Sequence, residues 1–445
     1  MKIDLIGSGG REAAIKWKLE KDGHVVTNNY PDLAFVGPEA PLANGIVDRY
    51  QFTHTPIVGP NRLAARLESS KLWAKQFMQR WDIPTARWLT YTRNPEGMTQ
   101  ALLDLDAYRN DRPHKIVSID PLNLENEYYP VVIKEDGLCG GKGVVIAKSK
   151  QEAWSNIPHI FINNRYKSPS NKVLFEDFIS GFEASCFVMS DGDTYKVLPY
   201  CKDYKRLEDG DKGPNTGGMG AIAPHPLITD KMKKIIENSI IKPTLNGMRL
   251  EGLKYKGILY IGLMINETGP YVIEYNVRFG DPECQVLMML MEDDLAPYLM
   301  AMAKGGLEDL PEPKFYEGSA ITVSLCSQGY PTEYKIDHII KGLENVNKDV
   351  QVFHAATEFD ETAQKFKTKG GRVLNVTALG EMLDKARGNV YNEIDKICFD
   401  NIAYRKDIGE EYVYRNKDEV ERRNKRHRGR SNTEKVRTTI RNKRD

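Results

Sequence analysis

The sequence predicts a multidomain protein that combines α/β and α+β architecture, and three observations support this prediction. The chain has 445 residues, which at roughly 150 residues per domain suggests about three domains. Hydrophobic residues make up 40% of the chain and charged residues 28%, a balance that excludes a disordered protein and allows a large core. Short apolar runs alternate with helical segments near both ends of the chain, which is the pattern of α/β folds.

The first 60 residues predict a small α/β unit. A short apolar run at residues 2–6 is followed by a glycine-rich turn, a helical segment at 12–19 and a second apolar run at 33–36. Pro41 suits the first turn of a helix that reaches about Tyr50. The turn GSGG lacks the G-x-G-x-x-G spacing of a dinucleotide site because residue 12 is Glu. Phosphate binding and a purely structural role both remain open for this turn.

The next 250 residues mix helix and strand patterns. Residues 61–80 predict one helix capped by Asn61, and the polar stretch 104–130 predicts a long loop because it lacks apolar periodicity. Residues 227–250 and 281–304 predict helices, and a glycine pair closes the second. Apolar runs predict strands at residues 88–91, 131–134, 143–147, 173–178, 258–265 and 271–276.

The end of the chain changes in character. Residues 318–414 return to alternating strand and helix patterns, with strands near 320–326 and 372–378. Residues 415–445 carry thirteen Lys or Arg against five acidic residues, so this basic tail is expected to be disordered. Its charge would attract nucleic acid non-specifically, and its lack of aromatic residues argues against recognition of particular bases.

Composition excludes several classes of protein. The longest apolar run has about six residues, at 286–291, so no transmembrane helix is expected, and the N-terminus lacks the apolar segment of a signal peptide. The six cysteines are scattered without a C-x-x-C pair, which favours reduced thiols in a cytoplasmic protein. The eight histidines are equally dispersed, so a zinc site is not expected.

Residues 131–147 carry the strongest chemical signal. Two β-branched runs flank a loop that contains four glycines and Lys142, and Lys134 ends the first run. Glycines let backbone N–H groups turn inward around a phosphate, and lysines add charge. A strand follows the loop and no Ser or Thr follows Lys142, so this is not a Walker loop. We expect a lid over phosphates that closes an antiparallel hairpin, and a plain glycine-rich hairpin is the alternative.

A second signal lies at residues 271–276 and just beyond them. Alternate residues of a strand share a face, so Glu274, Asn276 and Arg278 are expected to point together. Carboxylate and amide oxygens at this spacing suit Mg²⁺ ions that also hold phosphate oxygens, and Arg278 would neutralise phosphate charge. A solvated strand face is the alternative for the first two residues. Asp281 has a sufficient structural explanation as the cap of the next helix.

Residues 173–185 allow a nucleotide contact. Glu176 and Glu183 flank an apolar run and a turn. The run would form a hinge whose backbone bonds an adenine edge, and Glu183 would accept hydrogen bonds from ribose hydroxyls. An ordinary strand, turn and strand is the alternative.

Residues 202–224 allow a substrate contact. The segment 215–220 is dense in glycine and would let the backbone approach a small molecule, with polar contacts from Asp203, Lys205 and Arg206. A glycine-rich surface loop without function is the alternative.

These segments, in this order, resemble the ATP-grasp ligases, and most closely the phosphoribosylamine–glycine ligase family of purine biosynthesis. The resemblance covers most of residues 1–410. The combination of GPEAPL, PNTGGMGA and RFGDPE is specific to this family among its relatives. The matching stretches are GSGGRE, VGPEAPLANGIVD, SSK, IPTA, KEDGLCGGKGVVIA, EDFISGFEAS, DKGPNTGGMGA, YKGILYIGLM, VIEYNVRFGDPE, VFHAAT, GGRVLNVTALG and YRKDIG.

The resemblance implies a fold and a reaction. The fold would be an ATP-grasp core with a small α/β N-terminal domain and a C-terminal α/β domain. The implied divisions are 1–60, 61–312 with a mobile lobe at about 84–180, 313–414, and the tail 415–445. ATP, with Mg²⁺ or Mn²⁺, would phosphorylate the carboxylate of glycine, and the amine of 5-phosphoribosylamine would attack the acyl phosphate. No membrane partner is implied.

The resemblance also implies roles for individual residues. Contacts with the ATP phosphates are implied for Lys71, Lys134, Gly140, Gly141, Lys142 and Gly143, and contacts with adenosine for Glu176, Phe178, Ile179 and Glu183. Glu274 and Asn276 would hold the metal. Catalytic roles are implied for Lys134, Lys142, Arg278, Asp203 and Lys205. Substrate contacts are implied for Gly9, Arg11, Glu12, Pro38, Glu39, Asn215, Thr216, Gly217, Gly218 and Met219.

The chain departs from the family pattern near its N-terminus. Ala13 stands where the family usually has His, and the region before VGPEAP lacks one helix–strand unit. Two alternatives stay open, and the shortened N-terminal region motivates the first. One is an ATP-grasp ligase or carboxylase with another amine acceptor, and the other is a non-catalytic ATP-binding protein that recruits a polyanion through its tail.

Overall fold

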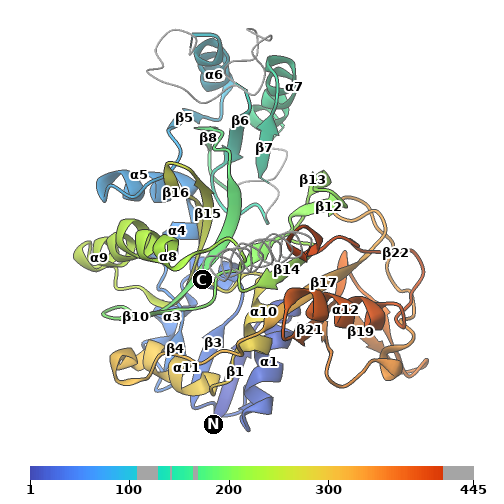
Figure 1. Ribbon diagram of the computed structural model, residues 1–445. Helices are drawn as coiled ribbons and strands as arrows, with labels where there is room; N and C mark the ends of the chain where they lie inside the picture. The colour runs from blue at the N-terminus through green and yellow to red at the C-terminus, as the bar shows by residue number, and fades with distance from the viewer. Residues whose placement is uncertain (108–128, 141–142, 164–168, 414–445) are drawn as a thin grey trace, which may run out of the picture.

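The computed structural model describes residues 1–107, 129–140, 143–163 and 169–413. These residues form three four-stranded sheets, one six-stranded sheet and two short hairpins. Helices pack on the larger sheets, and one lobe stands apart from the rest of the molecule at the top of Figure 1. The predicted combination of α/β and α+β parts is confirmed.

The N-terminal sheet is parallel, with strand order β2-β1-β3-β4. Its strands are β1 (Lys2–Ile6), β2 (Val25–Val26), β3 (Leu33–Val36) and β4 (Ile57–Val58), and its helices are α1 (Gly10–Lys21), α2 (Glu39–Ala43) and α3 (Ile46–Tyr50). The single helix predicted from Pro41 to Tyr50 is wrong. Gly45 interrupts it in the left-handed region, with φ of 76°, and a helix cannot continue through that conformation.

The helix predicted over residues 61–80 is also two helices, α4 (Arg66–Ser69) and α5 (Lys71–Arg80). The side chain of Asn61 accepts a hydrogen bond from the Ala64 N–H at 2.9 Å, but this caps only the turn before α4. Ser70 caps α5, because its hydroxyl accepts from the Trp73 N–H at 3.1 Å. The consequence is that Lys71 becomes the first residue of a new helix.

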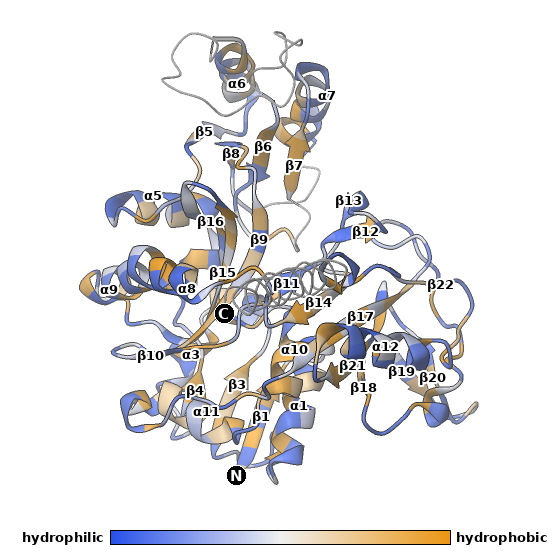
Figure 2. Cartoon of the chain, in the orientation of Figure 1, coloured by the Kyte–Doolittle hydropathy of each residue, from blue (hydrophilic) through white to orange (hydrophobic). Residues whose placement is uncertain are grey.

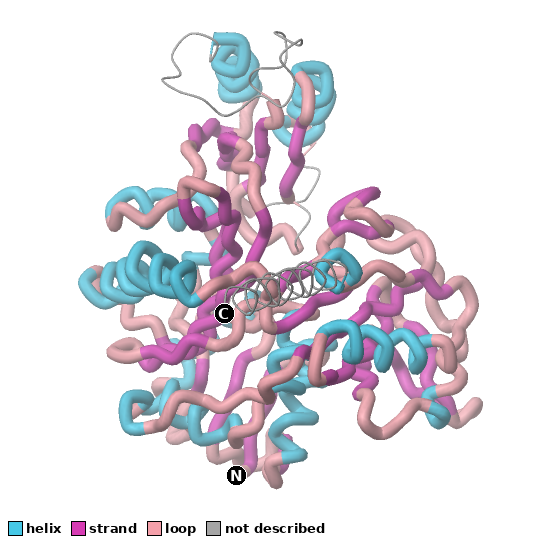
Figure 3. The backbone as a smooth tube through the Cα atoms, viewed as in Figure 1, coloured by secondary structure: helices cyan, strands magenta, loops and turns pink. Residues whose placement is uncertain are grey.

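The lobe at the top of Figure 1 contains an antiparallel sheet in the order β5-β8-β6-β7. Its strands are β5 (Trp88–Thr92), β6 (Val131–Glu135), β7 (Val144–Ala147) and β8 (Lys172–Asp177), with helices α6 (Pro95–Ala107) and α7 (Lys150–Phe161). The predicted hairpin around the glycine loop is confirmed, since Lys134 pairs with Val144 across β6 and β7. Both helices lie at the outer end of this lobe (Figure 3).

The sequence missed α6. The sequence patterns predict no element for residues 95–103, and residues 104–107 fall within the predicted polar loop, although Ala101 is fully buried in the core of the lobe. The rest of the predicted loop, residues 108–128, lies outside the described residues.

A second antiparallel sheet, in the order β10-β9-β15-β16, forms the centre of the molecule. Its strands are β9 (Phe182–Asp191), β10 (Tyr195–Val197), β15 (Lys256–Asn266) and β16 (Gly269–Asn276). The helices on it are α8 (Asp230–Ile236), a π-helical segment (Glu237–Ile241) and α9 (Lys242–Leu250). The predicted helix at 227–250 and the predicted strand pair at 258–276 are both confirmed.

The six-stranded sheet draws on distant parts of the chain. Its path is β11-β14-β17-β21-β18, and β22 adds to β17. Its strands are β11 (Lys202–Asp203), β14 (Gly220–Ala223), β17 (Ser319–Ser327), β18 (Gln351–His354), β21 (Arg372–Gly380) and β22 (Ile402–Ala403), and α12 (Leu383–Ile394) packs on it. The predicted strands near 320–326 and 372–378 are confirmed. The glycine-dense segment 215–220 thereby lies next to the C-terminal part of the chain.

The remaining elements are short. Two hairpins consist of β12 (Arg206–Glu208) with β13 (Lys212–Asn215), and β19 (Thr357–Asp360) with β20 (Lys365–Thr368); 3₁₀ turns occur at Leu307–Asp309 and Leu343–Asn345. The helix predicted over 281–304 is two helices, α10 (Glu283–Leu290) and α11 (Leu295–Lys304). Asp294 starts the second one, because its carboxylate accepts from the Ala296 N–H at 2.9 Å.

Apolar side chains of α10 and α11 join the N-terminal and central sheets in one continuous core. Figure 2 shows that hydrophobic residues gather on the strands of the sheets and hydrophilic ones on the outer helix faces. Every residue of α10 is buried, so the segment that follows β16 is held rigidly. Among the described residues, the structure contains no helix with the length and apolar character that a membrane span needs.

Candidate nucleotide and substrate site

Lys134 and Glu176 lie side by side on the neighbouring strands β6 and β8. Lys134 Nζ is 2.9 Å from Glu176 Oε2 and donates a second hydrogen bond to the carbonyl of Ile273 on β16 at 3.1 Å. Burial alone would raise the pKa of the Glu176 carboxyl, but the ammonium groups of Lys134 and Lys75 hold it below its ordinary value. Lys134 and Glu176, which are both predicted to contact ATP, thus form an ion pair with each other.

Lys71 reaches the loop between β6 and β7 from the start of α5. Its ammonium donates to the carbonyl of Gly137 at 2.8 Å. Gly140 has φ of 58°, a conformation that favours glycine, and a Cβ on Gly143 would lie 2.7 Å from the Cβ of Cys139. The loop therefore needs its glycines. The other two predicted loop residues, Gly141 and Lys142, lie outside the described residues.

The segment with Phe178 and Ile179 joins the sheet of the upper lobe to the central sheet, since β8 ends at Asp177 and β9 begins at Phe182. Both side chains are half-buried. This position is compatible with the predicted hinge between lobes. Glu183, one residue into β9, is exposed.

Lys205 brings two predicted site carboxylates together. Its Nζ lies 3.5 Å from Glu183 Oε2 and 3.6 Å from Glu274 Oε1. Burial would lower the pKa of Lys205, but the Tyr260 hydroxyl and these two carboxylates hold it well above its ordinary value. Lys205 therefore stays charged between Glu183, which is predicted to bind ribose, and Glu274, which is predicted to bind the metal.

Arg278 lies beside Asn276, as the strand pattern predicts. Its Nη2 donates to Asn276 Oδ1 at 3.0 Å and pairs with Glu68 Oε1 at 2.9 Å, while its Nε lies 3.3 Å from Glu39 Oε2. Burial would raise the pKa of Glu39, but Arg278 holds it below its ordinary value. Glu39, predicted to face the ribosylamine, is thus tied to the strand that carries the predicted metal ligands.

Glu12 explains the glycine-rich turn before α1. Its carboxylate accepts from the Gly9 N–H at 2.6 Å and pairs with Arg11 Nε at 2.9 Å. A Cβ on Gly37 would come within 2.2 Å of Glu12 Oε1, so the glycines leave room for this carboxylate. Pro38, the residue after Gly37, precedes α2.

Two arginines converge on one carbonyl next to this turn. Arg11 Nη1 donates to the carbonyl of Phe279 at 2.9 Å, and Arg278 Nη1 donates to the same oxygen at 3.1 Å. The N-terminal turn and the end of β16 are therefore parts of one polar cluster.

The Asn215–Met219 loop is fixed by residues that sequence reasoning did not select. Arg372 Nη1 donates to the carbonyl of Gly217 at 2.7 Å, and the Gly217 N–H donates to the Tyr330 hydroxyl at 2.9 Å. Thr216 donates to the Lys205 carbonyl at 2.9 Å. The loop therefore spans from Lys205 to the C-terminal sheet.

Asp281 does not cap the helix that follows it, and this prediction was wrong. Pro282 occupies the cap position of α10. The Asp281 carboxylate instead lies 3.0 Å from Arg372 Nη2 and accepts from the Gln285 side chain at 2.9 Å. Asp281 therefore forms an ion pair with Arg372, which is distant in the sequence, and makes no cap for α10.

Asp203 carries a buried carboxyl whose Oδ1 has no hydrogen-bond partner among the described residues. Burial, together with nearby Glu283, raises its pKa well above the ordinary value. A Cβ on Gly218 would lie 2.9 Å from that oxygen, so the glycine loop packs directly on it. The raised pKa favours the protonated form of this carboxyl beside the loop.

The structure thus brings most predicted site residues into one connected region. Sequence reasoning missed Lys75, Glu68 and Arg372. Lys75 follows Lys71 at the i, i+4 spacing that puts both on one helix face, and Arg372 stands in the motif GGRVLNVTALG. Glu68 had no comparable signal. Within the described residues, no three His, Cys, Asp or Glu side chains form a group that would hold a metal.

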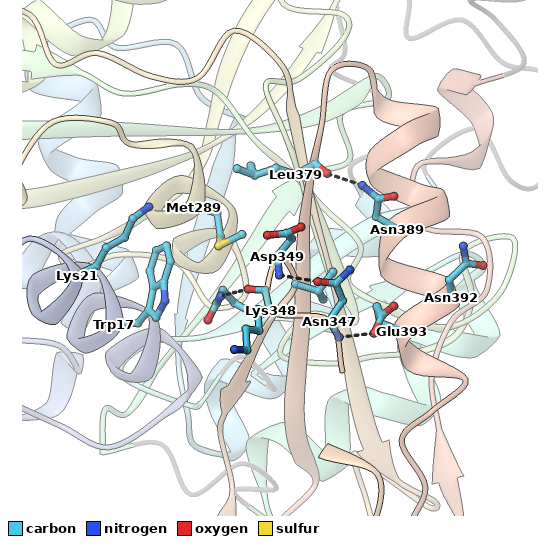
Figure 4. Close-up of a pocket in the computed structure, with 12 residues that line it drawn as sticks. Trp17, Lys21, Met289, Asn347, Lys348, Asp349, Leu379, Asn389, Asn392 and Glu393 are labelled. Carbon is cyan, nitrogen blue, oxygen red and sulfur yellow. Dashed lines mark hydrogen bonds between the residues drawn. The ribbon is translucent and has the colours of Figure 1, made fainter. Parts of the chain in front are cut away.

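A cavity of about 820 Å³ lies elsewhere, between α1 and the C-terminal part of the chain (Figure 4). Trp17 and Lys21 of α1 face Asn389 and Asn392 of α12 across it. None of the predicted site residues lines this cavity.

Comparison with known proteins gives consistent results. Three family models match: the N domain of phosphoribosylglycinamide synthetase over residues 23–68, its ATP-grasp (A) domain over 69–284, and its C domain over 320–411. A phosphoribosylamine–glycine ligase of Clostridium acetobutylicum is 37% identical, covering 92% of this chain and 99% of the relative. One of Chlorobaculum tepidum is 39% identical, with the same two coverages.

Solved structures agree. The crystal structure of a phosphoribosylamine–glycine ligase from Thermotoga maritima matches with a TM-score of 0.75 and 31% identity, over 92% of this chain and 100% of that one. A biotin carboxylase domain from Hydrogenobacter thermophilus, solved with MgADP, matches with a TM-score of 0.63 at 15% identity, covering 90% of this chain and 91% of that domain. The second match shows a shared fold only. With three domain models, full-length relatives and a full-length structure in agreement, this chain belongs to the phosphoribosylamine–glycine ligase family of ATP-grasp enzymes.

Proposed function

We infer that this chain is an ATP-dependent phosphoribosylamine–glycine ligase of purine biosynthesis. It joins glycine to 5-phosphoribosylamine and gives glycinamide ribonucleotide, ADP and phosphate. The observation that carries this inference is the 37–39% identity to phosphoribosylamine–glycine ligases over 92% of the chain. We propose that the enzyme acts in the cytoplasm.

We propose that the reaction passes through glycyl phosphate. A carboxylate resists attack by an amine because it lacks a leaving group, and transfer of the γ-phosphoryl group supplies one. The protein would then orient the reactants and stabilise charge on the group in transfer. A single connected polar region that joins lysines, carboxylates and a glycine loop suits these tasks.

We assign the triphosphate to the lysines at the loop end of the β6–β7 hairpin. Lys71 and Lys134 both lie there, and we include Lys142 with the backbone of Gly140–Gly143 on the strength of the sequence. Lys134 is held on both sides, by Glu176 and by the Ile273 carbonyl, so a bound phosphate would meet an oriented cation. The backbone of Phe178 and Ile179, with Glu176 and Glu183, would contact adenosine.

We assign Mg²⁺ or Mn²⁺ to Glu274 and Asn276. Both side chains offer the oxygen donors that these hard ions prefer. The residues present fit this role, since Glu274 Oε1 is only loosely paired, 3.6 Å from Lys205 Nζ, and Asn276 Oδ1 is bonded to Arg278 alone among the described residues. The ion would neutralise phosphate charge during transfer.

We place the acyl phosphate near Asp203, Lys205, Arg278 and the loop Asn215–Met219. Lys205 and Arg278 supply positive charge, and Asp203 is a candidate to move a proton. Gly9, Arg11, Glu12, Pro38 and Glu39 would face the ribosylamine. These residues are connected to the acyl phosphate region through Arg278, which contacts both Glu39 and Asn276.

A coupled assay tests the proposed function. Phosphoribosylamine is unstable, so it is generated in situ from ammonia and ribose 5-phosphate, and phosphate release is followed with and without glycine. The proposal requires phosphate release that depends on both substrates. Release with glycine and a different amine would point to another ligase, and absence of any glycine-dependent release would point to a non-catalytic ATP-binding protein.

A further inference from the structure

Lys75 is a buried lysine of α5, with 2% of its surface exposed. Its ammonium makes three polar contacts: Glu176 Oε2 at 2.9 Å, Thr85 Oγ1 at 2.8 Å and the Ala86 carbonyl at 3.4 Å. An ammonium group has three N–H donors. All three are therefore used within the protein, and Lys75 has none left for a ligand.

Lys134 differs in this respect. It also pairs with Glu176 Oε2 at 2.9 Å and bonds the Ile273 carbonyl, which uses two of its three donors among the described residues. The two lysines therefore share one carboxylate oxygen but have different tasks. Lys75 uses all of its donors within the protein, whereas Lys134 has one donor that no described residue accepts and that could bond the triphosphate.

The shared carboxylate is itself held in one orientation. Both lysines contact Oε2 of Glu176, and the other oxygen, Oε1, is buried without a hydrogen-bond partner among the described residues. A buried acceptor left without a donor costs free energy unless a ligand supplies one. The arrangement keeps one oxygen for the lysines and leaves the second for a donor on the bound nucleotide.

The same contacts connect the two lobes. Thr85 accepts from Lys75 and donates to the Val272 carbonyl of β16 at 2.7 Å, while Glu176 belongs to the sheet of the upper lobe. Lys75 thus joins β8, the segment before β5 and the strand that carries the predicted metal ligands. A substitution of Lys75 would therefore alter the orientation of Lys134 relative to the predicted metal ligands on β16.

We propose that Lys75 is a positioning residue for the ATP site, which fixes the carboxylate of Glu176 and thereby aims the ammonium of Lys134 at the triphosphate. This rests on the proposed function, in which Glu176 and Lys134 contact ATP. Without Lys75, Lys134 becomes the only partner of Glu176 within the described part of the chain and is drawn toward that carboxylate. The nucleotide loses affinity although no direct contact has been removed.

If Lys75 had a purely structural role, its replacement would affect folding and would leave ATP binding unchanged. Burial lowers the pKa of Lys75 to about 8 although Glu176 opposes this shift, so keeping the charge inside the protein is unfavourable in itself. When methionine replaces Lys75, one buried cation, Lys134, remains paired with one buried anion, Glu176, so the charges balance. The variant Lys75→Met is therefore expected to fold, and its defect is expected in nucleotide binding.

The test measures ATP binding by calorimetry in the full-length chain, together with KM for ATP and for glycine in the coupled assay. Lys75→Met should weaken ATP binding about 10- to 100-fold and raise KM for ATP while KM for glycine stays unchanged, and Lys75→Arg should recover part of the loss. Lys18→Met is the matched control. Lys18 is a buried lysine of α1 with 1% exposure, paired at 2.9 Å with Asp22, the residue that caps the end of this helix, and its loss should leave ATP affinity unchanged.

A double-mutant cycle separates positioning from stability. In a Glu176→Gln background, Lys75→Met should have little further effect on ATP affinity, because the carboxylate through which Lys75 acts is gone. If Lys75→Met does not fold, Thr85→Val, which removes one acceptor of Lys75, should weaken ATP binding in the same direction. Wild-type ATP affinity in Lys75→Met, or in Thr85→Val where only that variant folds, would overturn the proposal, as would fully additive losses in the cycle.

The binding measurement does not depend on turnover. If the wild-type chain shows no glycine-dependent phosphate release but Lys75→Met still weakens ATP binding, the proposed function fails and the positioning role stands. If the wild-type chain is active and Lys75→Met binds ATP normally, the positioning role fails and the function stands.

Discussion

Arg372 Nη2 lies 3.0 Å from Asp281 Oδ2, and this ion pair joins the C-terminal sheet to the turn that precedes α10. The same guanidinium donates to the carbonyls of Gly217 and Asp281, each at 2.7 Å. One side chain at the start of β21 thereby fixes both the glycine loop and Asp281, which lies in the turn between β16 and α10. The C-terminal sheet therefore contributes Arg372 to the contacts of the proposed site.

Replacement of Arg372 tests this arrangement. Arg372→Met should raise KM for glycine or for the ribosylamine about 10- to 100-fold, because the Gly217–Gly218 backbone loses its hydrogen-bond donor and Asp281 loses its charge partner. Arg372→Lys should recover little, since a lysine cannot reproduce the planar fork that serves several acceptors at once. Steady-state kinetics check this, and unchanged KM values for both substrates would show that the ion pair is only structural.

Lys134 and Glu274 are expected to be essential for turnover. Replacing either by alanine should lower kcat about 10²- to 10³-fold, because each would stabilise charge on the group in transfer. Thermal unfolding should show that both variants fold. Asn392→Ala, which changes a residue of the cavity in Figure 4 that no predicted site residue lines, should behave as wild type. Wild-type turnover in both Lys134→Ala and Glu274→Ala would refute the assigned roles.

His225 is expected to make stability depend on pH. Its Nδ1 accepts from the Leu227 N–H at 3.1 Å, so the proton sits on Nε2, which donates to the Glu183 carbonyl at 3.0 Å. Burial lowers the pKa of His225 to about 4, whereas an unfolded histidine has a pKa of about 6.5. The unfolded chain therefore binds more protons below pH 6.5, and the folded chain should lose about 3 kcal/mol between pH 6.5 and 4.

Denaturant unfolding at several pH values measures this effect. His225→Gln cannot take up a proton, so its stability should fall less steeply over the same pH range. Equal slopes for the wild-type chain and the variant would mean that other groups cause the acid sensitivity.

Gly37 is expected to tolerate no side chain. Gly37→Ala would bring its Cβ to within 2.2 Å of Glu12 Oε1, and such overpacking should lower the free energy of unfolding by about 1–3 kcal/mol. Gly388 is the control, because it is exposed in α12 and a Cβ there would meet nothing within 4 Å. Gly388→Ala should raise stability by about 0.5–1 kcal/mol, and equal effects of the two substitutions would contradict the packing argument.

The sequence predicted those parts of the fold that local patterns determine. The strand pair around Glu274 and the hairpin around the glycine loop follow from apolar alternation and glycine spacing, and both are present. The helix predicted through Gly45 failed because periodicity does not reveal a residue in the left-handed region. Helix α6 was missed because only a few of its residues, Ala101 among them, face the core.

The candidate site was predictable only in part, for a similar reason. Glu274 and Asn276 share a face of β16, and Arg278 follows two residues beyond its end, so their proximity could be derived from the strand pattern. The contacts of Lys75 and Arg372 join segments that are 101 and 91 residues apart, measured to Glu176 and Asp281. Pairings over such separations depend on the tertiary fold, and no local spacing encodes them.

The most direct test of the account is the coupled assay on the wild-type chain with phosphoribosylamine generated in situ. The account predicts that phosphate is released only when ATP, glycine and the ribosylamine are all present, with one glycinamide ribonucleotide formed for each phosphate. Phosphate release that does not depend on glycine, or the absence of glycinamide ribonucleotide among the products, would contradict it.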